Sequence, residues 1–115
     1  MAELYIEMPR GDIRHIKFKV YSDGKEFTDL DEIFFTVKSN AKTEKIIFQK
    51  KLSTEEITLE EDGFYHFTIL DTDTNDLGYG CYKFDIEILG DEIKQTKIGT
   101  LELTEEVTFA SNEGE

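Results

Sequence analysis

Two histidines and one cysteine are the residues of this 115-residue chain that could support nucleophilic or metal chemistry. His15, His66 and Cys81 each occupy an outward position in a stretch where polar and apolar residues alternate. A zinc site needs three or four converging ligands, and a nucleophilic triad needs a histidine beside an activated Ser or Cys and a third, orienting group. No histidine is near Cys81 in the sequence, so we expect no zinc site and no enzyme.

An acidic turn near the middle of the chain begins like a calcium loop, with Asp71, Asp73 and Asn75 alternating. An EF-hand loop also needs glycine at its sixth position and a bidentate glutamate at its twelfth. This chain has Asp76 and Tyr82 there. We therefore expect a polar crossover turn in which Asp71 caps one helical turn, with no bound metal. No glycine-rich phosphate loop occurs either, and we expect no cofactor.

The tripeptide Arg10-Gly11-Asp12 is one that some adhesion receptors recognise. All three residues are common, and they stand where a strand is expected to begin. We interpret them structurally, with Gly11 freeing the backbone and Asp12 closing a turn.

The charge is distributed unevenly along the chain. Residues 1–51 carry ten Lys/Arg and nine Asp/Glu, whereas residues 52–115 carry three and 17, giving a net charge of −13. A surface this acidic repels nucleic-acid phosphates and anionic lipids. We therefore expect neither nucleic acid nor membrane as a partner.

Length and composition predict one domain, which we place at residues 1–109, followed by a frayed acidic tail at residues 110–115. Apolar residues make up 38% of the chain, with one proline and no long apolar run. The first residues lack the pattern of a signal peptide, and one cysteine cannot form an internal disulfide. Folding in a reducing cytoplasm is therefore expected.

Alternation with a period of two runs through the chain, and helical periodicity is almost absent. Short strands with turn signals every 8–12 residues predict an antiparallel sandwich. The predicted strands are 4–8 (an edge strand ending at Pro9), 14–20, 33–38, 45–51, 57–60, 65–69, 82–89 and 94–104. The predicted inward side chains are Ile16, Phe18, Val20, Ile33, Phe35, Val37, Ile46, Phe48, Tyr82, Phe84, Ile86 and Ile88.

A Leu-x-x-Gly-x-Tyr corner, formed by Leu77, Gly80 and Tyr82, leads into the seventh of these strands. Such a corner is typical of immunoglobulin-like sandwiches, where the Tyr hydroxyl ties a crossover loop to the sheet. The fold class predicted from these patterns is all-β, an immunoglobulin-like antiparallel β-sandwich of seven to eight strands.

The first strand is the predicted interaction edge. An open strand edge offers main-chain hydrogen bonds to a partner. The residues of this candidate edge are Leu4, Tyr5, Ile6, Glu7 and Met8.

Several phrases follow one another in a characteristic order over residues 8–109. They are Arg10-Gly-Asp12-Ile-Arg14-His-Ile16-Lys-Phe18, Phe27-Thr-Asp-Leu30, Ile33-Phe-Phe-Thr-Val37-Lys, Asp71-Thr-Asp-Thr-Asn-Asp-Leu77, Gly80-Cys-Tyr82-Lys-Phe-Asp85-Ile and Leu103-Thr-Glu-Glu-Val107-Thr108. In this order they resemble the immunoglobulin-like N-terminal domain of bacteriophage baseplate upper proteins and related small phage tail and neck modules. Phe84 stands where that family often has a second Tyr, and the crossover lacks the usual proline.

The resemblance implies a non-catalytic structural module of a phage or prophage virion. Such a module would be made in the bacterial cytoplasm and would dock onto other virion proteins or copies of itself. The alternative is a carbohydrate-binding or cell-surface adhesion module, for which Tyr5, Tyr21 and Tyr79 would have to gather at one end of the sandwich.

Overall fold

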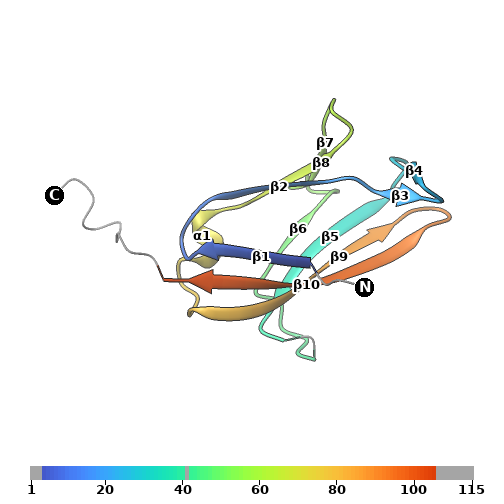
Figure 1. The fold of residues 1–115 in the computed structure, drawn as a ribbon. Coiled ribbons are helices and arrows are strands. Elements are labelled where there is room, and N and C mark those ends of the chain that lie inside the picture. The colour runs from blue at the N-terminus through green and yellow to red at the C-terminus, as the bar shows by residue number, and fades with distance from the viewer. Residues whose placement is uncertain (1–3, 41, 106–115) are drawn as a thin grey trace.

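The computed structural model describes residues 4–40 and 42–105, which form an almost entirely β structure with one short helix (Figure 1). The tail expected at residues 110–115, and residues 106–109 of the expected domain, lie outside the described residues. The elements are β1 (Leu4–Pro9), β2 (Arg14–Phe18), β3 (Tyr21–Ser22), β4 (Lys25–Glu26), β5 (Glu32–Lys38), β6 (Phe48–Lys51), β7 (Thr58–Leu59), β8 (Tyr65–Ile69), α1 (Asp71–Thr74), β9 (Gly80–Leu89) and β10 (Lys94–Thr104).

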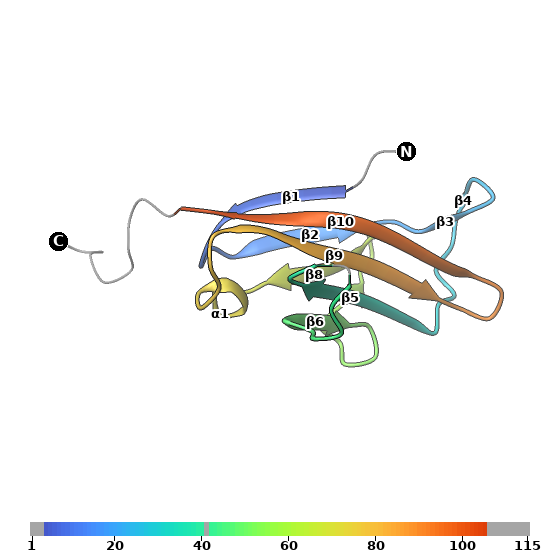
Figure 2. The same cartoon turned by 90° about the horizontal axis from the view of Figure 1, so that it is seen from below.

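Two sheets face each other, as Figure 2 shows from below. The larger has the strand order β1-β10-β9-β5-β6, and the smaller has the order β2-β8-β7. Strands β3 and β4 form a separate hairpin around a turn in which Asp23 and Gly24 have positive φ angles of 54° and 78°. The chain changes sheet four times, between β1 and β2, between β2 and β5, between β6 and β7, and between β8 and β9. The last of these crossovers contains α1.

The expectation of a wholly antiparallel sandwich is wrong at one edge. Strand β1 pairs with β10 in parallel, from Leu4 opposite Gly99 to Pro9 opposite Thr104. The chain turns after Pro9 into the other sheet, so no hairpin constrains β1 to run against its neighbour. The described residues also hold ten strands rather than seven or eight. The additional two are the two-residue strands of the β3–β4 hairpin.

Aromatic and branched side chains fill the space between the sheets. Phe35 of β5 is completely buried, and its ring lies 4.5 Å from that of Phe67 in β8 and 5.2 Å from that of Phe84 in β9. Phe35 therefore joins the two layers. Burying one such large apolar side chain stabilises the fold by about 1.5–3 kcal/mol.

The inward position expected for Ile46 is a second error. β6 begins only at Phe48, and the side chain of Ile46 is 45% exposed. Because side chains alternate along a strand, the residue that faces inward with Phe48 is Lys50, which is buried.

Candidate docking surface

The predicted interaction edge lies at one border of the larger sheet, with its side chains divided between the two faces. Met8 is buried and Ile6 is half-buried against the core, whereas Tyr5 is 57% exposed. The Tyr5 hydroxyl donates a hydrogen bond to the Glu102 carboxylate on the outer face of β10. The inward half of β1 therefore stabilises the sandwich. On its side away from β10, none of the described strands pairs with β1, and the Glu7 carbonyl oxygen accepts a hydrogen bond from the Arg14 guanidinium at 3.1 Å.

In the described residues, β10 extends beyond β1 toward its own amino-terminal end. β1 covers only Gly99–Thr104, whereas β10 begins at Lys94 and pairs with β9 from there onward. Among residues 4–40 and 42–105, no strand pairs with Lys94–Ile98 on the side away from β9. Along any strand, every second residue directs its N–H and C=O groups to the same side. We call this stretch the β10 notch.

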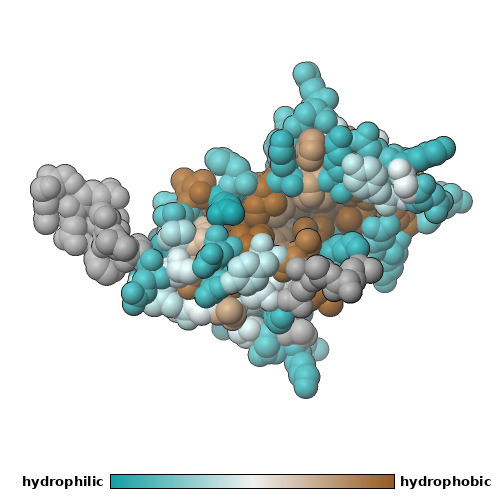
Figure 3. All heavy atoms as spheres, viewed as in Figure 1, coloured by the Kyte–Doolittle hydropathy of each residue, from teal (hydrophilic) through white to brown (hydrophobic). Residues whose placement is uncertain are grey.

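An apolar groove of about 880 Å³ opens beside the β10 notch. Figure 3 shows it as a brown hollow between the border of the smaller sheet and that of the larger. The Gln95 side chain crosses one end of it and donates to the Tyr21 carbonyl oxygen at 3.3 Å. The groove exists because the three-stranded sheet covers only part of the five-stranded one. Its lining includes Leu4, Phe18, Val20, Ile86, Ile88 and Ile98.

The corner predicted from Leu77, Gly80 and Tyr82 lies at the start of β9. The Tyr82 hydroxyl donates to the Gly78 carbonyl oxygen at 2.7 Å, a bond of the kind that a tyrosine corner makes. Leu77 packs against the core, and Gly80 has a φ of 124°, a conformation that favours glycine. The corner holds the crossover between the two sheets.

The tripeptide Arg10-Gly11-Asp12 forms the turn between β1 and β2. The Asp12 N–H donates to the Pro9 carbonyl oxygen at 3.2 Å, and Gly11 has a φ of 82°. The Arg10 guanidinium lies 4.4 Å from the centre of the Tyr79 ring. The arginine is therefore stacked on the crossover rather than extended toward a receptor.

Sequence reasoning missed a buried polar link between the crossover and the larger sheet. Lys50 Nζ lies 2.7 Å from Asp73 Oδ2, and the same oxygen accepts the Leu70 N–H at 2.8 Å. The expectation that Asp71 caps the helix is wrong, because Leu70 is the N-cap residue and Asp71 is the first helical residue. The only hint of this ion pair in the sequence was the position of Lys50, which lies two residues after Phe48 and therefore faces inward in an alternating strand.

Thr74 is a second residue that sequence reasoning missed. Its side chain is completely buried, and its Oγ1 accepts the Gly11 N–H at 2.9 Å. This bond joins the β1–β2 turn to the β8–β9 crossover. The strand that carries the candidate edge is thus fixed at its carboxyl end.

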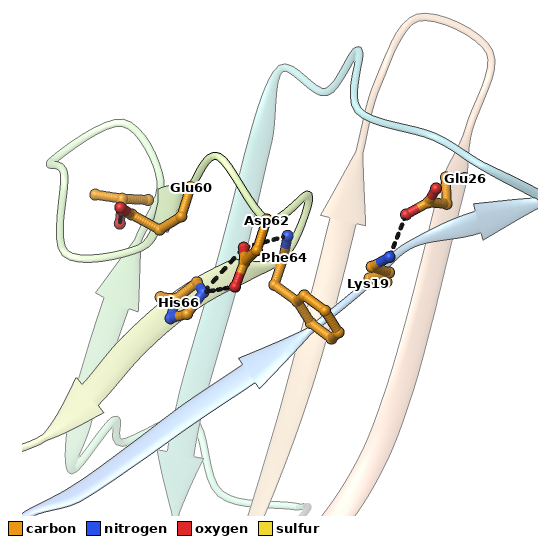
Figure 4. Close-up of polar contacts among 7 residues, drawn as sticks. Lys19, Glu26, Glu60, Asp62, Phe64 and His66 are labelled. Carbon is orange, nitrogen blue, oxygen red and sulfur yellow. Dashed lines mark hydrogen bonds and ion pairs between the residues drawn. The ribbon is translucent and has the colours of Figure 1, made fainter.

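A group of polar contacts surrounds the tip of the β7–β8 hairpin (Figure 4). His66 Nε2 lies 3.1 Å from Asp62 Oδ2, and Lys19 Nζ lies 2.6 Å from Glu26 Oε1. The Phe64 N–H donates to Asp62 at 2.9 Å, and this bond is the main reason why the pKa of Asp62 is lowered. These are solvent-exposed pairs, which stabilise a fold weakly and form no enclosed site.

The two histidines share the outer face of the smaller sheet, but each has its own partner. His15 Nδ1 lies 3.0 Å from Thr68 Oγ1, whereas His66 contacts Asp62. Cys81 is exposed on β9 in the other sheet. In the described part of the chain, no three His, Cys, Asp or Glu side chains are grouped as metal ligands would be.

The three tyrosines considered for sugar binding do not gather at one end. Tyr21 belongs to β3, whereas Tyr79 precedes β9 beside α1, at the opposite end of the sandwich (Figures 1 and 2). Tyr5 lies on the outer face of the larger sheet, and Tyr79 is stacked on Arg10. A carbohydrate platform of these three rings is not formed.

No helix in residues 4–40 and 42–105 is both long and apolar enough to cross a bilayer. Comparison of the chain with protein-family models, curated proteins and solved structures gives no match.

Proposed function

We propose that the all-β fold is an immunoglobulin-like sandwich. Its strand order supports this assignment. In the immunoglobulin convention, β2, β8 and β7 take the places of strands B, E and D, and β5, β9 and β10 take those of C, F and G. The Tyr82 corner then falls on the E–F crossover, where immunoglobulin-like domains carry it.

We further propose that the chain is a non-catalytic structural module of a phage or prophage virion, acting by protein–protein docking. The observation that carries the docking role is the apolar groove between the two sheets, because a large exposed apolar hollow is typical of a protein–protein interaction site. The order of sequence phrases described above supports a place in the baseplate, tail or neck. The partners are other virion proteins or copies of the same chain.

The virion assignment is tested by fractionating particles from the bacterium that carries the gene. After induction, particles are purified through a density gradient, and the chain is quantified against the major capsid protein by mass spectrometry. We expect the chain to co-sediment with particles at a fixed copy number. A chain that remains entirely in the soluble fraction, while tail proteins sediment, would contradict the assignment.

The docking role has a separate test. Leu4, which lines the groove and is 42% exposed, is replaced by Glu. We expect Leu4→Glu to abolish incorporation into particles while leaving the melting temperature nearly unchanged. The matched control is Ile46→Glu, since Ile46 is also exposed but lies outside the groove. Equal incorporation of both variants would contradict docking through the groove.

A further inference from the structure

The outer face of the larger sheet is in contact with solvent near its centre. Side chains alternate along a strand, and Phe84, Ile86 and Ile88 of β9 are buried, so the residues between them point outward. Ile98 of β10, which lies opposite Asp85, is 53% exposed. Two hollows of about 150 and 220 Å³ also open there, and Asp85 belongs to the lining of both. The outward residues at this centre are Asp85 and Glu87 of β9, Phe34, Thr36 and Lys38 of β5, and Thr96 and Ile98 of β10.

This face is electrically balanced, although the chain as a whole has a net charge of −13. Two copies of such an acidic chain repel each other where their carboxylates meet. At the outward positions of β5, β6, β9 and β10, four lysines offset four carboxylates, so this repulsion is cancelled. These residues are Lys38, Lys51, Lys83 and Lys94, with Glu32, Asp85, Glu87 and Glu102.

The charges at the centre of the face lie in separate rows that cross the strands. Lys38 of β5 is paired in register with Lys83 of β9, and like charges in opposite positions of a sheet are unfavourable. Two rows further along the strands, Glu87 has the uncharged Phe34 and Thr96 as its opposite residues. Glu87 is therefore complementary in charge to the lysine row. One copy cannot stack the two rows on each other, because both belong to the same face.

We propose that this face binds the same face of a second copy, about a two-fold axis that crosses the strands at Asp85. Rotation about this axis reverses the direction of every strand and keeps each strand over its own counterpart. The Lys38 row of each copy then lies over the row of Glu87 and Phe34 in the other, and Ile98 lies over Ile98 of the second copy. Such a contact is isologous, so it ends at a dimer. The proposal rests on neither the apolar groove nor the virion assignment.

The position of the axis has a measurable consequence. It brings Asp85 of one copy close to Asp85 of the other, and two neighbouring carboxylates repel each other. Asp85→Asn should therefore tighten self-association of the full-length chain about threefold or more, as measured by sedimentation at pH 7. Asp91→Asn, at an exposed position between β9 and β10, is the matched control. Unchanged or weaker association of Asp85→Asn would overturn the proposal.

A second test exchanges charges between copies. Lys38→Glu places like charges over each other at two points of every dimer, and Glu87→Lys does the same with the opposite sign. Each variant alone should raise the dissociation constant about tenfold or more. An equal mixture of the two should associate as tightly as the wild-type chain. In the mixed dimer, the new carboxylate lies over the new ammonium, and the unchanged Lys38 lies over the unchanged Glu87.

The controls make the same changes of net charge elsewhere. Lys25→Glu in β4 and Glu61→Lys in the β7–β8 turn alter exposed side chains outside the face and should leave association unchanged. A wild-type chain that stays monomeric at millimolar concentration would contradict the proposal. It would also be rejected if the mixture failed to recover association although both variants keep the wild-type melting temperature.

A third test measures the geometry of the dimer. Cys81 of β9 is the single cysteine of the chain and is exposed, so it can carry a nitroxide label. It lies four residues from Asp85. With a rise of about 3.4 Å per residue and sheets about 10 Å apart, the proposed axis separates the two copies of Cys81 by about 30 Å. Double electron–electron resonance should give a peak near this distance. A peak at about 15 Å or shorter, expected if the two β9 strands ran in the same direction, would rule out the proposed axis.

These results are independent of the particle experiments. Charge-dependent dimerisation of a chain that is missing from particles would retain this inference and reject the virion assignment. Incorporation into particles of a chain that stays monomeric would do the reverse.

Discussion

Lys50 of β6 and Asp73 of α1 form a buried ion pair, with Nζ 2.7 Å from Oδ2 and side-chain exposures of 8% and 15%. The pair connects an edge strand of the larger sheet to the crossover that leads into β9. Its members are far apart in the sequence, and each would be unfavourable in the interior without the other. The crossover is therefore held from two sides, by this pair and by the Gly11–Thr74 hydrogen bond.

Removing one member of this pair should destabilise the protein strongly. Asp73→Ala leaves the Lys50 ammonium buried without a counter-charge, and we expect a loss of about 3 kcal/mol in the free energy of unfolding. Urea denaturation measures the change. Replacing both partners by apolar residues, in Lys50→Met/Asp73→Leu, should recover a large part of the loss. A double variant as unstable as Asp73→Ala would contradict the explanation.

Removing the hydrogen bond of the Tyr82 corner should cost less stability than breaking the ion pair. Tyr82→Phe removes the hydroxyl that donates to the Gly78 carbonyl at 2.7 Å and keeps the ring. We expect a loss of about 1 kcal/mol, the usual net contribution of one hydrogen bond. Tyr21→Phe, at an exposed tyrosine of β3, is the matched control and should be neutral in the same thermal or urea denaturation. Equal effects of the two substitutions would mean that the corner bond contributes nothing.

Gly99 permits the close approach of β1 to β10. A methyl group at this position would lie 2.3 Å from Cζ of Phe84 and 2.7 Å from the Leu4 carbonyl oxygen. We expect Gly99→Ala to destabilise the fold by about 1–3 kcal/mol and to speed hydrogen exchange of the β1 amides. In contrast, Gly78→Ala, whose methyl would contact only the Tyr82 hydroxyl at 3.8 Å, should leave β1 exchange unchanged.

The raised pKa of Asp85 predicts that the stability of the protein depends on pH. Partial burial is the main cause of its raised pKa, and the neighbouring Glu87 raises it further while Lys38 lowers it. The folded state thus binds a proton at Asp85 more tightly than the unfolded state. Its contribution to stability is present below the ordinary pKa of 3.8 and is lost as the pH rises through the folded pKa.

The matching experiment compares Asp85→Asn with the wild-type chain by urea denaturation from pH 3 to pH 7. We expect the variant to be the more stable protein at pH 7, with the difference shrinking toward pH 3. Glu87→Gln removes one cause of the shift and should give a smaller change of the same sign. A variant that is less stable than wild type at pH 7 would show that the Asp85 carboxylate is stabilising instead.

The sequence alone determined the strands of this protein and most of its core. Period-two alternation is a local property, because successive side chains of any strand point to opposite faces whichever strand lies beside it. For this reason, a strand lies in each of the eight predicted ranges, and Phe35 and Ile88 face the interior as expected. The same parity rule placed Cys81 outward.

Only the tertiary structure decided how these strands meet. The parallel direction of β1 depends on which sheet the chain enters after Pro9, and no residue within β1 encodes that choice. The Lys50–Asp73 pair and the β10 notch likewise arise between segments distant in sequence, where pairing is set by the packing of the two sheets rather than by local pattern. The apolar groove follows from how far the smaller sheet covers the larger one, which becomes visible only once the two sheets are packed together.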